Sequence, residues 1–181
     1  MNLPQLKHPG YTIEDWKTWE GRWELIHGEA YCMTAPSPNH QRVSFRIQKA
    51  IDAALEQGKR KGGGSCEVFN APIDLYLPGE QSVYQPDLVV VCDPTKITTR
   101  GIEGIPDLVV EITSPSTSGR DWAKKRWVYE AAGVPEYLIV DPEGQLGLLL
   151  RLEGGRYEEA ARIEWGEVVA LLGGKLSITL E

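Results

Sequence analysis

Two short apolar runs that open with the same phrase constrain this chain most. One reads Pro86-Asp87-Leu88-Val89-Val90-Val91, and the other reads Pro106-Asp107-Leu108-Val109-Val110-Glu111. Runs of this length that are rich in valine are typical of β-strands. Tyr137-Leu138-Ile139-Val140 is a third run, and its near-continuous apolar character is typical of a strand buried on both faces.

Helical periodicity occurs before the first of these strands and again between the second and the third. Apolar residues keep helical spacing from residue 40 to 57, and a second helix is predicted over residues 120–132, ending at Gly133. Short turns predict two hairpins, an N-terminal one over residues 23–33 and a C-terminal one over residues 147–162. We therefore predict one mixed α/β domain over residues 1–181, made of three parts: an N-terminal helix and hairpin (1–35), a core (36–145) and a C-terminal β extension (146–181).

The charge of the chain restricts how it can bind nucleic acid. The formal net charge is −7 over 181 residues, whereas proteins that bind nucleic acid broadly have a basic surface. Binding must therefore be local, weak, or made by an oligomer that gathers its positive residues. The acidic charge and the abundant tryptophan also lead us to expect a homo-oligomer. No apolar run approaches the roughly 20 residues that span a bilayer, and residues 1–6 lack a signal-peptide core. These features predict a cytoplasmic protein without membrane contact.

The three cysteines are an odd number without a close pair. Cys32, Cys66 and Cys92 each lie in an apolar stretch. This pattern suggests neither a disulfide framework nor a thiolate zinc site. We expect three buried structural thiols.

Glu111 is the acidic residue that stands out in the strand phrases. Side chains alternate along a strand, so Asp107, Val109 and Glu111 share one face. Glu111 stands where the first phrase has Val91, and a lone buried acid is costly unless it is paired or bound to a cation. If the strands are neighbours, the carboxylate of Asp87 converges on it. Two carboxylates about 4 Å apart repel by roughly 4 kcal/mol, and Mg²⁺ would relieve this repulsion.

A lysine-bearing helix follows the second strand. Asp121, Lys125 and Tyr129 are spaced by four residues and share one helix face. A lysine close to the acids could hold the attacking water or stabilise the negative charge that develops on the phosphate in the transition state. The simpler interpretation is that Lys125 pairs with Asp121 on a solvated helix face, and that Asp87 is only a turn residue beside a proline.

An ordered set of motifs resembles a known family. The order is Glu24-Leu25-Ile26, Ser37-Pro38 before His40, the two Pro-Asp phrases, Ser114-Pro115-Ser116-Thr117, Asp121, Lys125, Tyr129, and Gly133-Val134-Pro135-Glu136-Tyr137 leading to Val140-Asp141-Pro142. This set resembles the Uma family of restriction-endonuclease-like proteins, a branch of the PD-(D/E)xK nuclease superfamily. The resemblance covers roughly residues 20 to 145.

The resemblance implies a restriction-endonuclease-like core with a mixed central sheet flanked by helices. It further implies a Mg²⁺-dependent, or Mn²⁺-dependent, endonuclease that acts on DNA. Asp87 and Glu111 correspond to the metal-binding acids. The superfamily lysine is replaced by Thr113, and Lys125 matches the family's helical lysine better than Lys124 does. Glu24, His40, Asp121 and Tyr129 match further recurring positions and form a second tier of candidates.

A second function, from another class, stays open. A relative of these nucleases that has lost catalysis would bind nucleic acid or protein, or would only assemble. The sequence does not distinguish DNA from RNA as the substrate. A serine hydrolase has no support because no Gly-x-Ser-x-Gly motif occurs, and Gly62–Gly64 is not followed by the lysine of a phosphate-binding loop.

Overall fold

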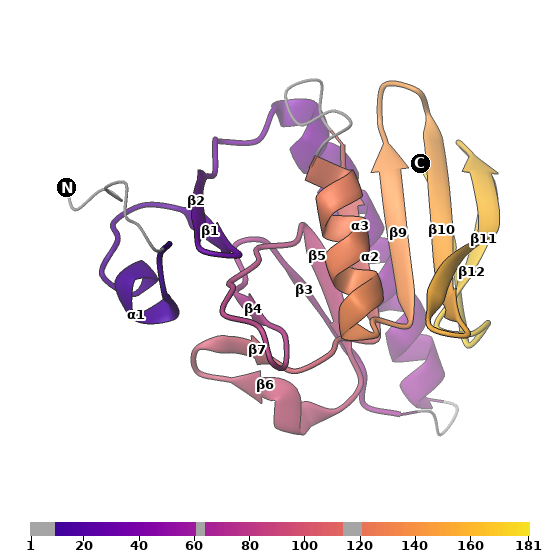
Figure 1. The fold of residues 1–181 in the computed structure, drawn as a ribbon. Coiled ribbons are helices and arrows are strands. Elements are labelled where there is room, and N and C mark those ends of the chain that lie inside the picture. Colours follow the sequence, from indigo (N-terminus) through magenta and orange to yellow (C-terminus); the bar gives the residue numbers. More distant parts are fainter. Residues whose placement is uncertain (1–9, 61–63, 114–120) are drawn as a thin grey trace.

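A six-stranded mixed sheet forms the centre of the protein (Figure 1). The protein's structure is a computed structural model, which describes residues 10–60, 64–113 and 121–181. Side chains are described over the same ranges except at residues 121–123. The strands lie in the order β11-β10-β9-β8-β5-β3. β8 and β9 are parallel, and the other neighbours in the sheet are antiparallel. Their bounds are β3 Glu67–Asn70, β5 Leu88–Val91, β8 Leu108–Ile112, β9 Glu136–Asp141, β10 Leu146–Glu153 and β11 Arg156–Glu164.

The two faces of this sheet are covered by different elements. Helix α2 (Pro38–Arg60) packs on one face together with the hairpin of β12 (Val168–Leu171) and β13 (Leu176–Thr179). Helix α3 (Asp121–Ala132) packs on the other face, and Figure 1 shows α3 in front of the sheet and α2 behind it. The predicted fold class, a mixed sheet flanked by helices, is confirmed.

Smaller elements extend the α3 side of the sheet. A β-hairpin and a three-stranded sheet in the order β4-β7-β6 pack there. The N-terminal helix is short and begins with a capping box of Thr12 and Asp15. The bounds of these smaller elements are α1 Ile13–Trp16, β1 Trp23–Ile26, β2 Glu29–Cys32, β4 Leu75–Tyr76, η1 Pro94–Lys96, β6 Ile97–Thr98 and β7 Gly101–Glu103. Within the described ranges, no helix has the length and apolar character needed to cross a membrane.

The two strand phrases lie side by side. β5 pairs with β8 so that Leu88 is opposite Val110 and Val90 is opposite Leu108. The side chains alternate as predicted: Leu108, Val110 and Ile112 pack against α2, whereas Val109 packs on the α3 face. Glu111 therefore points to the α3 face, where Glu24 and Lys125 are also buried.

The prediction of three buried free thiols is wrong. Cys66 and Cys92 form a disulfide, and Cys32 is an exposed free thiol. The reason is the antiparallel pairing of β3 and β5, in which Glu67 is opposite Val91. This register places the flanking Cys66 and Cys92 opposite each other, although 26 residues separate them in the sequence.

Candidate active site

A cleft of about 790 Å³ opens at the end of the sheet where β5 begins and β8 ends. Asp87 immediately precedes β5, and extending the β5–β8 register by one pair places it opposite Glu111. Both acids line the cleft, together with Glu24, His40 and Lys125. The structure thus brings five of the seven candidate residues to one cavity, from β1, α2, β5, β8 and α3.

Asp87 is fixed through one of its two carboxylate oxygens. Its Oδ2 accepts a hydrogen bond from the backbone N–H of Ile112 at 2.7 Å and lies 3.2 Å from Nε2 of His40. His40 is in the first turn of α2, where its N–H donates to the Ser37 hydroxyl that caps the helix. The hydrogen bond to Asp87 raises the pKa of His40, and burial acts in the opposite direction.

Glu111 is also fixed through a single oxygen. Its Oε1 accepts hydrogen bonds from Nζ of Lys125 at 2.9 Å and from the Tyr129 hydroxyl at 3.0 Å. Lys125 and Tyr129 are one turn apart on α3, so the predicted helix face does meet the strand. Burial raises the pKa of Glu111 to about 7; Lys125 acts against this rise, and the charges of Asp87 and Glu24 add to it.

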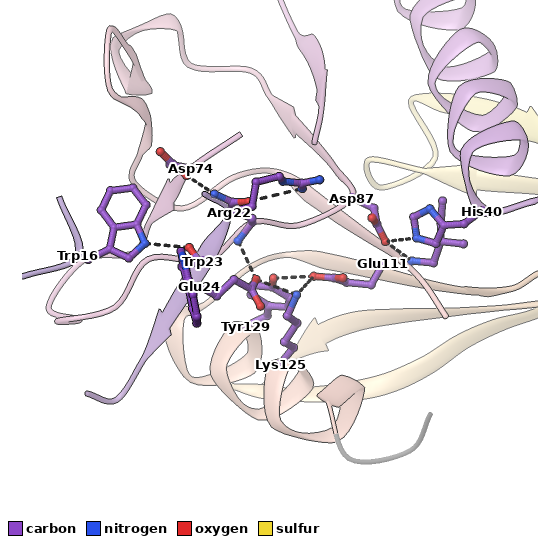
Figure 2. Close-up of polar contacts among 12 residues, drawn as sticks. Trp16, Arg22, Trp23, Glu24, His40, Asp74, Asp87, Glu111, Lys125 and Tyr129 are labelled. Carbon is purple, nitrogen blue, oxygen red and sulfur yellow. Dashed lines mark hydrogen bonds and ion pairs between the residues drawn. The ribbon is translucent and has the colours of Figure 1, made fainter. Parts of the chain in front are cut away.

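Lys125 lies between two carboxylates, as Figure 2 shows. Its Nζ is 2.9 Å from Oε1 of Glu24 and 2.9 Å from Oε1 of Glu111. Burial disfavours the charged ammonium, but the two carboxylates outweigh burial and raise the pKa of Lys125. Glu24 is buried on β1 and also accepts from the N–H of Gln85 at 2.7 Å. The ammonium is therefore held in place and charged.

Lys124 and Asp121 complete the set of residues named from the sequence. Lys124 is exposed, and its Nζ is 3.1 Å from the Tyr31 hydroxyl, so Lys125 and not its neighbour contacts Glu111. The side chain of Asp121 falls outside the described residues. Lys125 is buried and pairs with Glu24 and Glu111, so it does not lie on the solvated helix face of the simpler interpretation.

The unused oxygens of the two acids set this site apart from a structural ion pair. Within the described residues, Oδ1 of Asp87 and Oε2 of Glu111 accept no hydrogen bond. Glu136, another buried acid, differs: one of its oxygens accepts from Arg151 and Gly173, and the other accepts from Leu172. Glu136 is saturated by protein donors, whereas Asp87 and Glu111 each keep an oxygen for something else.

Two residues of the cleft wall were not predicted. The Tyr137 hydroxyl and Nε of Arg22 are buried without a hydrogen-bond partner in the described part of the chain, and both residues line the cleft. Burial raises the pKa of Tyr137, and the charge of Glu111 adds to the rise. The sequence gives little signal for either residue, because Tyr137 reaches the site only through the parallel pairing of β9 with β8. Buried polar groups normally have hydrogen-bond partners, so these two groups indicate that the cleft binds a polar ligand.

Comparison with known proteins identifies the family of the chain. The family model described as "Uma2: Putative restriction endonuclease" matches residues 12–181, and the chain belongs to that family. The uncharacterized protein slr1290 of Synechocystis is 30% identical over 76% of this chain and 72% of its own length. The uncharacterized protein sll1609 of the same organism is 29% identical over 65% of each chain, so this chain spans just under two thirds of that relative.

A solved structure shares the fold. The crystal structure from Anabaena variabilis, described as a putative nuclease belonging to DUF820, superposes with a TM-score of 0.72. The match covers 94% of this chain and 95% of the other, at 17% sequence identity. The likeness at this identity establishes a common fold, here a nuclease-like fold. The membership predicted from the motifs is confirmed by the family match.

Proposed function

We propose that this protein is a Mg²⁺-dependent endonuclease that hydrolyses phosphodiester bonds in DNA. Asp87 and Glu111 bind the metal, and Lys125 stabilises charge on the phosphate. Family membership supports the class of enzyme. The observation that carries the proposal is the pair of unused carboxylate oxygens at the cleft, because each acid is fixed by one oxygen and leaves the other for a ligand.

The donor set fits magnesium. Mg²⁺ usually takes one or two carboxylates and completes its shell with water and phosphate oxygens. Over the described ranges, no group of three or more His, Cys, Asp or Glu side chains is arranged to hold a metal alone, which disfavours the closed cages of structural zinc. Two carboxylates, Glu24 and Glu111, share one lysine, and the charge of Asp87 acts on Glu111 without a contact to that lysine. When bound, Mg²⁺ supplies Lewis-acid activation of the phosphate and a more acidic water.

The protein side chains would act by fixing positions before substrate arrives. Tyr129 and Lys125 hold Oε1 of Glu111, and His40 with the Ile112 N–H holds Oδ2 of Asp87. An ammonium group has three donors, and Lys125 uses two of them on Glu24 and Glu111. Its third donor would bind a phosphate oxygen where negative charge develops. Glu24 is thus a positioning residue for the lysine.

The test is a cleavage assay with metal and substrate varied. Duplex DNA, single-stranded DNA and RNA are incubated with Mg²⁺, Mn²⁺ or a chelator. We expect DNA cleavage that needs the metal and that falls by at least about 100-fold in Asp87→Asn and Glu111→Gln. Asp107→Asn is the matched control, since Asp107 stands in the same Pro-Asp-Leu phrase and also accepts a backbone N–H, that of Cys92. This control should cleave as the wild type does.

Three results would contradict the proposal. Cleavage that survives chelation, or that persists in both acid variants, would refute the assigned site. Preferred cleavage of RNA would refute the proposal that DNA is the substrate. An absence of cleavage under all metals and substrates would instead favour the second function, a nuclease-fold protein that binds or assembles without turnover.

A further inference from the structure

A second pocket, of about 510 Å³, adjoins the cleft. Ile26, Tyr31 and Lys124 line both cavities, so the pocket lies directly beside the cleft. His27 of the β1–β2 turn and Trp127 of α3 form its outer part, with ring centroids 6.2 Å apart and planes tilted by 60°. Nothing in the chemistry proposed above uses this pocket.

The exposure of Trp127 is unusual for so large an apolar side chain. Its relative exposure is 62%, although its neighbour Val128 on the same helix is buried. Among the described residues, the large apolar side chains that are exposed are Phe45, Trp127, Leu146 and Val168. The two aromatic ones both belong to this region, since Phe45 lines the cleft and Trp127 lines the pocket.

We propose that this pocket binds an unpaired base of the DNA strand next to the phosphate held in the cleft, with the base stacked on Trp127. This inference rests on the proposed function, because the cleft must hold a phosphodiester for its neighbouring nucleotide to reach the pocket. The preferred substrate is accordingly single-stranded DNA, or DNA with an unpaired base at the site. Bases in a duplex have both faces covered by their neighbours and cannot stack on a protein ring.

The polar groups at the pocket suit a nucleotide. Lys124 lies on the boundary with the cleft, with its Nζ 3.1 Å from the Tyr31 hydroxyl and 5.3 Å from the centre of the Tyr31 ring. A cation at this point faces the phosphates on either side of the base. Glu29 lines the pocket and accepts a hydrogen bond from Tyr31, and a carboxylate can also accept from the amino group of a base.

Base stacking also resolves the difficulty of the acidic chain. With a net charge of −7, the protein cannot depend on many phosphate contacts for affinity. Stacking on an aromatic ring contributes affinity without charge and tolerates any base. The spacing of the six tryptophans gives no sign of this role. The sign is the exposure of one of them beside the cleft.

The test measures binding apart from cleavage. A fluorescently labelled single-stranded oligonucleotide is titrated with the full-length protein in a chelator, and anisotropy gives the dissociation constant. We expect tighter binding of the single strand than of the duplex. Trp127→Ala should weaken single-strand binding by roughly 5-fold to 100-fold, and Trp127→Phe should retain most of it. Val168→Ala is the control, because Val168 is equally exposed, at 66%, but lies on β12.

A scan with abasic nucleotides links the ring to a base. Removing one base at a time should weaken wild-type binding at one position, and the same removal should have no further effect in Trp127→Ala. Equal binding of single-stranded DNA by Trp127→Ala and wild type would overturn the inference. So would a change from oligomer to monomer in Trp127→Ala with unchanged DNA affinity, because the pocket would then be an interface between two copies of the chain.

The two proposals fail in different ways. If metal-dependent cleavage is found but neither binding nor cleavage responds to Trp127, the base pocket is wrong and the proposed nuclease stands. If Trp127 governs single-strand binding but no metal supports cleavage, the enzyme assignment is wrong, and the pocket survives as part of a DNA-binding protein.

Discussion

The β5–β8 pair has the same Pro-Asp-Leu phrase at each of its two ends, and the ends make the same backbone contact. At one end, Oδ2 of Asp87 accepts the N–H of Ile112 at 2.7 Å. At the other end, Oδ2 of Asp107 accepts the N–H of Cys92 at 2.8 Å. Because the strands are antiparallel, the two contacts occupy equivalent positions in the ladder. An aspartate that ties down the neighbouring strand is therefore a feature of strand ends in this protein.

The ends differ in the residue next to that contact. Val91 is fully buried in an apolar cluster, whereas Glu111 is held by Lys125 and Tyr129 at the cleft. The difference shows that the Pro-Asp phrase by itself does not mark a site. The site exists where a second acid, a buried lysine and an open cleft are added to the same strand-end contact.

Exchanging the two differing residues should have the largest effect. Val91→Glu puts a carboxylate into apolar surroundings, and a raised pKa of about three units there costs at least about 4 kcal/mol. Glu111→Val removes a buried charge and leaves Lys125 paired with Glu24, but it also leaves the buried Tyr129 hydroxyl without its acceptor. We therefore expect a smaller loss of unfolding free energy, about 1–3 kcal/mol. Urea denaturation near neutral pH measures both. A Glu111→Val variant that loses as much as Val91→Glu would show that Glu111 is a structural acid.

The ends should also differ in their response to metal. A ligand that binds only the folded state at 100 times its dissociation constant stabilises that state by about 2.7 kcal/mol. Mg²⁺ or Mn²⁺ should therefore raise the melting temperature of the wild type, and a chelator should reverse the rise. Asp107→Asn should keep this response, and Glu111→Gln should lose it. An equal response in both variants would place the metal away from the cleft.

The strands themselves were accessible from sequence because local pattern determines them. The apolar runs, the turn residues and the alternation in residues 107–112 predicted β5, β8 and β9 and the face on which Glu111 lies. The helical spacing of Lys125 and Tyr129 predicted that they share a face, and both contact Glu111. Each of these inferences depends on residues close together in the chain.

Contacts between segments that are distant in the chain could not be predicted from the sequence. Glu24 reads as an ordinary hairpin acid, and only the packing of β1 beside α3 brings it to 2.9 Å from Lys125. The Cys66–Cys92 disulfide depends on the β3–β5 register, and the partnerless Tyr137 hydroxyl on the β8–β9 pairing. No local pattern records such pairings. The single domain and the homo-oligomer remain predictions.

The smallest effect should come from the two aspartates themselves, and its sign is informative. Asp107→Asn replaces a charged acceptor by a neutral one and should cost about 1 kcal/mol of unfolding free energy. Asp87→Asn makes the same replacement, but it also removes one of the charges that raise the pKa of Glu111. Relief of that repulsion offsets the weaker hydrogen bond, so Asp87→Asn should be the less destabilising variant when no metal is present. Denaturation of both variants in chelator measures the difference. If Asp87→Asn were instead the more damaging change, the contact with Ile112 and His40 would outweigh the repulsion, and the Asp87 end would be a structural feature like its counterpart.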